Sequence, residues 1–172
     1  EMKDQIKGVN FLKEKSYVDP NRIAVHGWSY GGFMTTSLLT NYDDVFTCGV
    51  AGGPVMDWKW YEVMYGERYM DQPQDNPDGY AKTSLLQKAK ELKDPLLLIH
   101  GTSDDVVVMQ HNLSFVKACV EAGVQVDFFP YPMHKHNVRG KDRVHLMQKV
   151  LNYIIANNLS LIHISEPTRL LR

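Results

Sequence analysis

One pentapeptide, GWSYG at residues 27–31, limits the fold of this chain more than any other feature. It matches the pattern G-x-S-x-G, which marks a sharp strand-to-helix turn that exposes a nucleophilic serine. A match alone is weak evidence, but here the apolar run 23–25 precedes it and a helical pattern follows it over 31–39. The sequence therefore predicts a nucleophile at Ser29, with glycines on both sides because neighbouring backbone crowds the turn.

Strand-like and helix-like patterns alternate along the rest of the chain. With 172 residues and a hydrophobic share of 44%, the chain can form one domain with a real core. Strands that alternate with helices are typical of an α/β fold, in which helices cover both faces of a mostly parallel sheet. The predicted strands span 23–25, 48–52, 96–99 and 126–129, and the predicted helices span 2–15, 31–39, 110–122 and 144–156.

Residues 54–79 are the one long irregular region in this pattern. They are rich in aromatic residues at first and then in Asp, Asn and Pro. A long excursion from a sheet is more often functional than structural, so this segment is predicted to contribute to a site.

A serine hydroxyl is a poor nucleophile until a base takes its proton, and a third group orients that base. In folds with this turn the chain order is serine, acid and then histidine. The third predicted strand leads to Asp104 and Asp105, and the fourth leads to His134 and His136. We favour Asp104 as the acid, with Asp105 near the entry of the next helix. Periodicity does not choose between the two histidines.

The two cysteines and the remaining histidines are predicted to be structural. Cys48 and Cys119 lie in apolar stretches, so both are expected in the core rather than as reactive thiols. No histidine pair has the helical spacing of a metal site, so no metal is predicted. His26 and His100 end strands beside glycine and are expected to be packed, whereas His111 and His145 lie on helices and are expected to be exposed or hydrogen-bonded.

Charge and hydropathy argue against several classes of partner. The chain has 19 basic and 20 acidic side chains, for a formal net charge of -1. Such a balance predicts no binding to nucleic acid. No apolar run is long enough to span a membrane.

Both ends of the chain are expected to differ from those of the natural protein. The chain opens on Glu1, already in a helical pattern and without an initiator methionine, so an upstream segment is expected. The last helix is predicted to be complete at residues 157–158, and residues 160–172 resemble a translated sequencing adapter. The expected organisation is a partial α/β-hydrolase domain over 1–159 and a non-native or disordered tail over 160–172.

Three separated motifs together resemble those of the prolyl oligopeptidase family, in its dipeptidyl peptidase IV branch. They are GWSYGG at 27–32, HGTSDD at 100–105 and HNVRG at 136–140, with GERYM at 66–70 as further support. The resemblance extends over about residues 2–158. It implies the α/β-hydrolase fold, with this chain as a C-terminal part of the catalytic domain.

The resemblance assigns catalytic roles and a binding pocket. It implies a triad of Ser29, Asp104 and His136 that works without a cofactor. The backbone N–H of Tyr30 would be one oxyanion donor, and a tyrosine upstream of this chain would supply the other. The positions that match the proline pocket of such enzymes are Val55, Trp58, Tyr61 and Tyr65, whose aromatic and branched side chains suit a flat, rigid ring.

Two further positions bear on the length of the released peptide. Val106 stands where dipeptidyl peptidase IV has an asparagine, and this departure resembles the bacterial prolyl tripeptidyl peptidases. Glu62 matches a glutamate that helps those enzymes hold the free amino terminus of the substrate. A desolvated ammonium group needs a carboxylate partner of this kind. The implied function is a serine exopeptidase that releases Xaa-Xaa-Pro tripeptides. The alternatives are release of Xaa-Pro dipeptides or, less favoured, an esterase.

The resemblance also implies features outside this chain. Family members carry a β-propeller ahead of the hydrolase domain and act on proline-containing oligopeptides. A location in the periplasm, in the cell envelope or outside a bacterial cell is implied, and a homodimer of the full-length protein is left open. Without the upstream part, the fragment is expected to be inactive and poorly stable.

Overall fold

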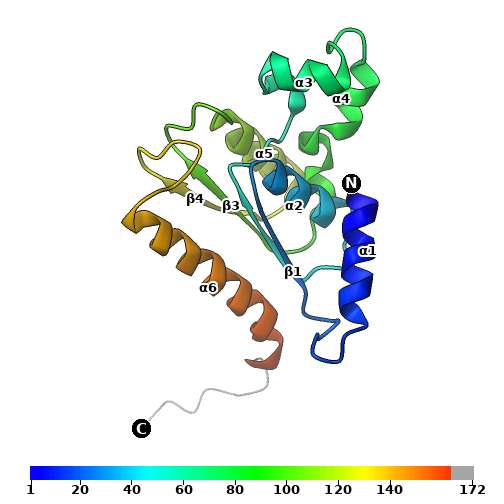
Figure 1. The fold of residues 1–172 in the computed structure, drawn as a ribbon, viewed down its shortest axis with the longest axis vertical. Coiled ribbons are helices and arrows are strands. Elements are labelled where there is room, and N and C mark those ends of the chain that lie inside the picture. Colours follow the sequence, from blue (N-terminus) through cyan, green and yellow to red (C-terminus); the bar gives the residue numbers. More distant parts are fainter. Residues whose placement is uncertain (164–172) are drawn as a thin grey trace.

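Four parallel strands form a single sheet in the computed structural model, which describes residues 1–163 (Figure 1). The spatial order follows the chain order, β1-β2-β3-β4. In register, Val25 lies opposite Gly49, and Val50 lies opposite Leu97. All four predicted strands are confirmed, and they span Ala24–Trp28 (β1), Cys48–Gly52 (β2), Leu96–Gly101 (β3) and Asp127–Tyr131 (β4).

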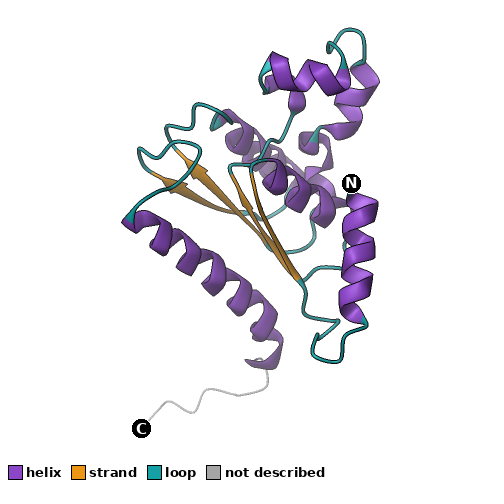
Figure 2. Cartoon of the chain, in the orientation of Figure 1, coloured by secondary structure: helices purple, strands orange, loops and turns teal. Residues whose placement is uncertain are grey.

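Helices cover both faces of the sheet (Figure 2). One face packs against the helices α1 (Met2–Lys13), α2 (Tyr30–Asn41) and α5 (Gln110–Ala122) and the 3-10 segment η2 (Leu85–Glu91). The other face packs against α6 (Lys141–His163). Because both faces are covered, β2 and β3 are buried at every position.

Alternate residues of the central strands point to opposite layers, as the pleat of a strand requires. Leu96 and Leu98 belong to the core beneath α2 and α5, whereas Leu97 and Ile99 belong to the core beneath α6. Both cysteines are free and buried, as predicted.

The irregular region between β2 and β3 is more ordered than its composition suggested. It contains η1 (Trp58–Trp60), α3 (Val63–Met70) and α4 (Pro77–Thr83). Asn76 caps α4 by accepting a hydrogen bond from the N–H of Gly79, with Pro77 at the first helical position. The two helices stand beyond the carboxyl ends of the strands (Figure 1), where this type of sheet binds its ligands.

Two predictions of local structure need correction. The last helix does not end at 157–158 but continues to His163, so the first residues of the predicted tail are helical. The rest of that tail, residues 164–172, lies outside the described residues. His26 was predicted to be packed but is exposed, because β1 pairs only with β2 within residues 1–163.

Candidate active site

Ser29 occupies a strained turn between β1 and α2. Its backbone has φ 59° and ψ -119°, a region that a residue with a side chain seldom adopts. The Ser29 N–H donates a hydrogen bond of 2.8 Å to the carbonyl of Gly52, the last residue of β2. The strain is thus maintained by the neighbouring strand, as a nucleophile elbow requires.

The glycines around the serine are not equivalent. A Cβ on Gly27 would lie 2.2 Å from the carbonyl oxygen of Gly31, so no side chain fits there. A Cβ on Gly31 would meet no atom within 4 Å, and the prediction that crowding requires this second glycine is therefore wrong. The crowded position after the serine is Gly32, where a Cβ would approach the Gly52 oxygen to 2.8 Å.

The candidate acid and base are already hydrogen-bonded. Nδ1 of His136 lies 2.8 Å from Oδ2 of Asp104, which is 8% exposed. Oδ1 of the same carboxylate accepts the backbone N–H groups of Val106 and Val107, each at 2.9 Å. Burial would raise the pKa of Asp104, but the hydrogen bonds from two histidines and two N–H groups outweigh it. The pKa of this carboxyl therefore lies well below its ordinary value.

The neighbouring candidates are engaged elsewhere. Asp105 is exposed and forms an ion pair of 2.7 Å with Lys135. His134 contacts Asp142 at the start of α6, also at 2.7 Å. The geometry therefore joins Asp104 to His136 and leaves the two adjacent alternatives at the surface.

The loop that carries His136 is held next to the serine turn. The indole N–H of Trp28 donates 2.8 Å to the His136 carbonyl. A Cβ on Gly53 would lie 3.2 Å from Cε1 of the imidazole, so the ring packs against the backbone that follows β2. Within the described residues the Ser29 hydroxyl makes no hydrogen bond. In enzymes without substrate, the contact between the nucleophile and its base is often long.

The N-terminus of α2 offers a donor for an oxyanion. Tyr30 is the first residue of this helix, and the first N–H groups of a helix have no partner within it. The N–H of Tyr30 follows Ser29 directly, which is the position of an oxyanion donor in an elbow of this type. Burial raises the pKa of the Tyr30 phenol from its ordinary value to about 12.

Aromatic side chains gather beside this turn around Trp58. Its ring lies 5.9 Å from that of Tyr30, 5.5 Å from that of Tyr61 and 6.2 Å from that of Tyr65. Val55 and Trp58 are buried in the same cluster. A cavity of about 460 Å³ borders the cluster, with Tyr30, Phe33, Trp58 and Tyr65 among the residues that line it.

Sequence reasoning missed Val107, which is fully buried in this aromatic cluster. It belongs to the uniform run Val106-Val107-Val108, in which both neighbours are exposed. A run of three identical residues has no periodicity, so no sequence signal separated the inward residue from the outward ones.

The two residues connected with peptide length lie outside the cluster. Glu62 is exposed at the residue before α3, and its charge, after burial, contributes to the raised pKa of Tyr61. Its carboxylate has no hydrogen bond or ion pair among residues 1–163. Val106 is 47% exposed and lines a groove of about 450 Å³ together with His136 and Arg139.

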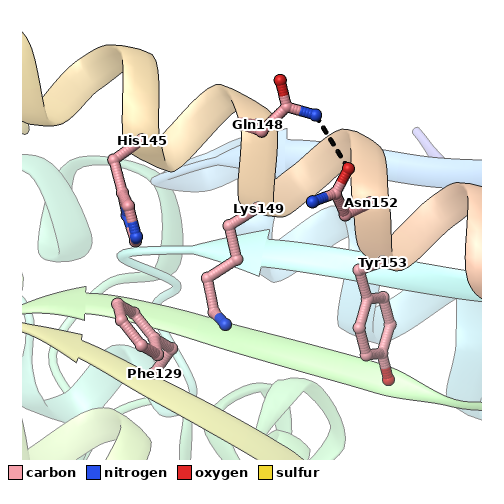
Figure 3. A pocket seen from close by; sticks show the side chains of 6 residues that line it. All are labelled: Phe129, His145, Gln148, Lys149, Asn152 and Tyr153. Atoms are coloured by element: carbon pink, nitrogen blue, oxygen red, sulfur yellow. Dashed lines mark hydrogen bonds between the residues drawn. The ribbon is translucent and has the colours of Figure 1, made fainter.

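A separate hollow of about 380 Å³ lies between β4 and α6 (Figure 3). Lys149 extends over the ring of Phe129, with its ammonium nitrogen 4.0 Å from the ring centre. No triad candidate lines this hollow.

Over residues 1–163, no three His, Cys, Asp or Glu side chains cluster as metal ligands would. In the same part of the chain, no helix has both the length and the apolar character needed to cross a bilayer.

Known proteins resemble this chain over nearly its whole length. The model of the prolyl oligopeptidase family matches residues 1–159. Dipeptidyl peptidase 4 of Bos taurus is 40% identical over 141 residues, which are 80% of this chain and 18% of that protein.

Two solved structures share the fold. A Bacteroides ovatus protein assigned as a dipeptidyl aminopeptidase IV has a TM-score of 0.89 and 58% identity, over 91% of this chain and 22% of the other. Dipeptidyl peptidase 4 of Porphyromonas gingivalis has a TM-score of 0.86 and 35% identity over the same shares. The chain thus spans about a fifth of the length of these relatives, within an α/β-hydrolase fold. From this match and from a serine turn, an acid and a histidine in the expected order, we conclude that the chain belongs to the prolyl oligopeptidase family.

Proposed function

We propose that the full-length protein is a serine exopeptidase that cleaves after proline near the amino terminus of oligopeptides. The observation that carries the proposal is the 2.8 Å contact between His136 and Asp104, beside a strained Ser29. The dipeptidyl peptidases among the relatives support a peptidase over an esterase.

The geometry suits acyl transfer. Since Asp104 is ionised, Nδ1 of His136 carries the proton of their hydrogen bond and Nε2 is left as an acceptor. Nε2 takes the hydroxyl proton as Ser29 Oγ attacks the carbonyl carbon of proline, and returns it to the departing amine. Water then attacks the acyl-enzyme by the same route and releases the peptide with a free carboxylate. The Tyr30 N–H stabilises the oxyanion in both halves of the reaction.

The aromatic cluster is the proposed site for proline. A proline ring is rigid and apolar, so a pre-formed wall of Trp58, Tyr61 and Tyr65 loses little entropy on binding it. Val55 and Val107 complete the wall as buried branched side chains.

The first test replaces the nucleophile. In the full-length protein, Ser29→Ala should lower kcat for Ala-Pro and Ala-Ala-Pro anilides by at least about 10³-fold, since the base then has no hydroxyl to activate. Ser103→Ala is the matched control, because Ser103 is exposed in the turn after β3 and makes no side-chain hydrogen bond within residues 1–163. Hydrolysis by Ser29→Ala near the parent rate would show that the nucleophile lies elsewhere.

We further propose release of tripeptides, with dipeptide release as the alternative. The aromatic cluster and Ser29 position the scissile bond, so the distance to the group that binds the amine sets the peptide length. Each extended residue adds about 3.3 Å to that distance. Exposed Glu62 and Val106 match the tripeptidyl pattern, whereas the relatives named dipeptidyl peptidases favour the shorter product.

The second test compares the two lengths directly. Ala-Ala-Pro anilide should be turned over faster than Ala-Pro anilide, and the opposite order would favour dipeptide release while leaving the serine mechanism intact. Glu62→Gln should raise KM for both substrates, because the ammonium group loses its partner. An N-acetylated tripeptide anilide is the control, since it has no ammonium group for Glu62 to bind.

Turnover of short acyl esters without turnover of either proline anilide would instead support the esterase alternative. An esterase would also be insensitive to the charge of Glu62.

A further inference from the structure

A third polar side chain contacts the candidate triad from the buried side. His100 lies in β3 and is fully buried. Its Nε2 is 2.7 Å from the carbonyl oxygen of Val107 and 3.3 Å from Oδ2 of Asp104. It was expected only to pack at the end of a strand, and the mechanism above does not use it.

The carbonyl contact determines which nitrogen of His100 carries hydrogen. A carbonyl oxygen can only accept, so Nε2 must be the N–H donor of the ring. Nδ1 is buried without a hydrogen-bond partner. A proton there would be a buried donor without an acceptor, which is costly, so the ring is a neutral donor at Nε2.

This donor connects two parts of the proposed site. On Asp104, Oδ2 faces both Nε2 of His100 and Nδ1 of His136, while Oδ1 accepts two backbone N–H groups. The carboxylate is therefore restrained on every side. The same Nε2–H contacts the carbonyl of Val107, whose side chain is part of the aromatic cluster.

We propose that His100 is a positioning residue, which orients Asp104 toward His136 and holds Val107 in the wall of the proline pocket. This inference rests on the triad of the proposed function. His100 touches neither substrate nor the reacting atoms, so it acts through the carboxylate and through the turn at residues 104–107.

Three titratable groups lie around His100, and each belongs to a different part of the fold. Asp104 follows β3, His136 follows β4, and His111 lies on α5. The pKa of His111 is lowered to about 4, chiefly by burial, so this neighbouring ring is neutral at neutral pH. Removing the His100 donor leaves Asp104 with less of its charge compensated. A carboxylate in that state holds the proton on His136 more strongly.

Two substitutions of His100 distinguish the role of its Nε2–H donor from that of the volume of its ring. In His100→Gln the amide nitrogen reaches the position of Nε2, whereas the shorter side chain of His100→Asn does not. His111→Gln is the control for burial, because His111 is equally buried but accepts the Met56 N–H and forms no hydrogen bond or ion pair with Asp104 within residues 1–163.

The experiment measures how fast a fluorophosphonate phosphonylates Ser29 in the full-length protein, with loss of fluoride, from pH 5 to pH 9. This probe reports the reactivity of the serine whatever peptide the enzyme prefers. His100→Asn should react about tenfold more slowly, and the acidic limb of its profile should move to higher pH. His100→Gln should keep the parent limb and react within about threefold of the parent rate. His111→Gln should keep the parent limb.

Three results would overturn the inference. The first is a folded His100→Asn variant whose labelling rate and acidic limb of the pH profile both equal those of the parent. The second is a folded His100→Gln that is as slow as His100→Asn, which would assign the role to packing. The third is a shifted limb in His111→Gln. If His100→Asn does not fold, the rate and limb of His100→Gln still decide. A parent protein that the probe does not label would instead contradict the proposed function.

Discussion

Neighbouring residues of the same type have different environments in this site. Asp104 is buried and surrounded by donors, whereas Asp105 is exposed beside Lys135. The pKa of each carboxyl is lowered, but for Asp105 the cause is a hydrogen bond from an exposed lysine, which water and salt screen. Only Asp104 can therefore orient a histidine in a reproducible geometry.

At the same scale, we predict different tolerance at the two glycines of the G-x-S-x-G motif. Gly27→Ala should destabilise the protein by about 1–3 kcal/mol or more, because its Cβ would overlap the backbone of Gly31. Gly31→Ala should change stability by less than about 1 kcal/mol, because the space is open and alanine favours a helix. The thermal midpoints of the two full-length variants check this, and equal losses would contradict it.

At the scale of elements, the segment that carries the aromatic cluster is attached to a helix far away in the chain. Met56, just before the wall residue Trp58, donates its N–H to Nδ1 of His111 on α5 at 3.0 Å. The carboxylate of Asp57 accepts the Ser84 hydroxyl at 2.8 Å. These contacts hold the segment that leaves β2, although it contains little regular structure before α3.

The His111 anchor predicts a dependence of stability on pH. The pKa of His111 is lowered from its ordinary value to about 4, chiefly by burial, so between about pH 6.5 and 4 the unfolded chain binds a proton that the folded chain does not. Stability should therefore fall as pH falls through this window, by up to roughly 3 kcal/mol. Below it, loss of the ionised Asp104, whose pKa is also lowered, should destabilise the protein further.

The thermal midpoint of the full-length protein, measured from pH 7.5 to pH 4, checks this dependence. His111→Gln removes the titrating ring and should flatten the decrease, whatever its midpoint at neutral pH. His145→Gln is the control, because His145 is a histidine of α6 that contacts the Tyr131 hydroxyl instead. A decrease of equal steepness in all three proteins would show that other groups cause it.

At the scale of the whole molecule, the site lies at one end of the sheet and the packed helices lie along its faces. The residues after each of the four strands contribute to it, and α3 and α4 stand beside it (Figure 1).

The homodimer and the upstream propeller implied by the family resemblance stay predictions. On its outer side, α6 carries an exposed apolar stripe formed by Val144, Met147, Leu151 and Ile155.

The sequence alone determined the order of strands and helices, the turn at Ser29 and the two loops that carry an acid and a histidine. These follow from local patterns, since the apolar period distinguishes a strand from a helix and glycine marks a turn. The pattern also indicated a sheet with both faces covered, which the two cores confirm.

Only the tertiary structure decided which residues meet. The family resemblance named Asp104 and His136, but only the structure shows their side chains 2.8 Å apart. It also places Val107 in the aromatic cluster, buries His111 beside Met56 and sets the donor of His100 against the carboxylate. It also showed that Gly32, and not Gly31, is the crowded glycine after the serine. Most of these contacts join residues that are 20 or more positions apart in the chain. The contact of His100 with Asp104 is local, but it depends on how the turn after β3 folds back on the strand. Periodicity carries no information about such contacts, because they arise only when distant segments pack together.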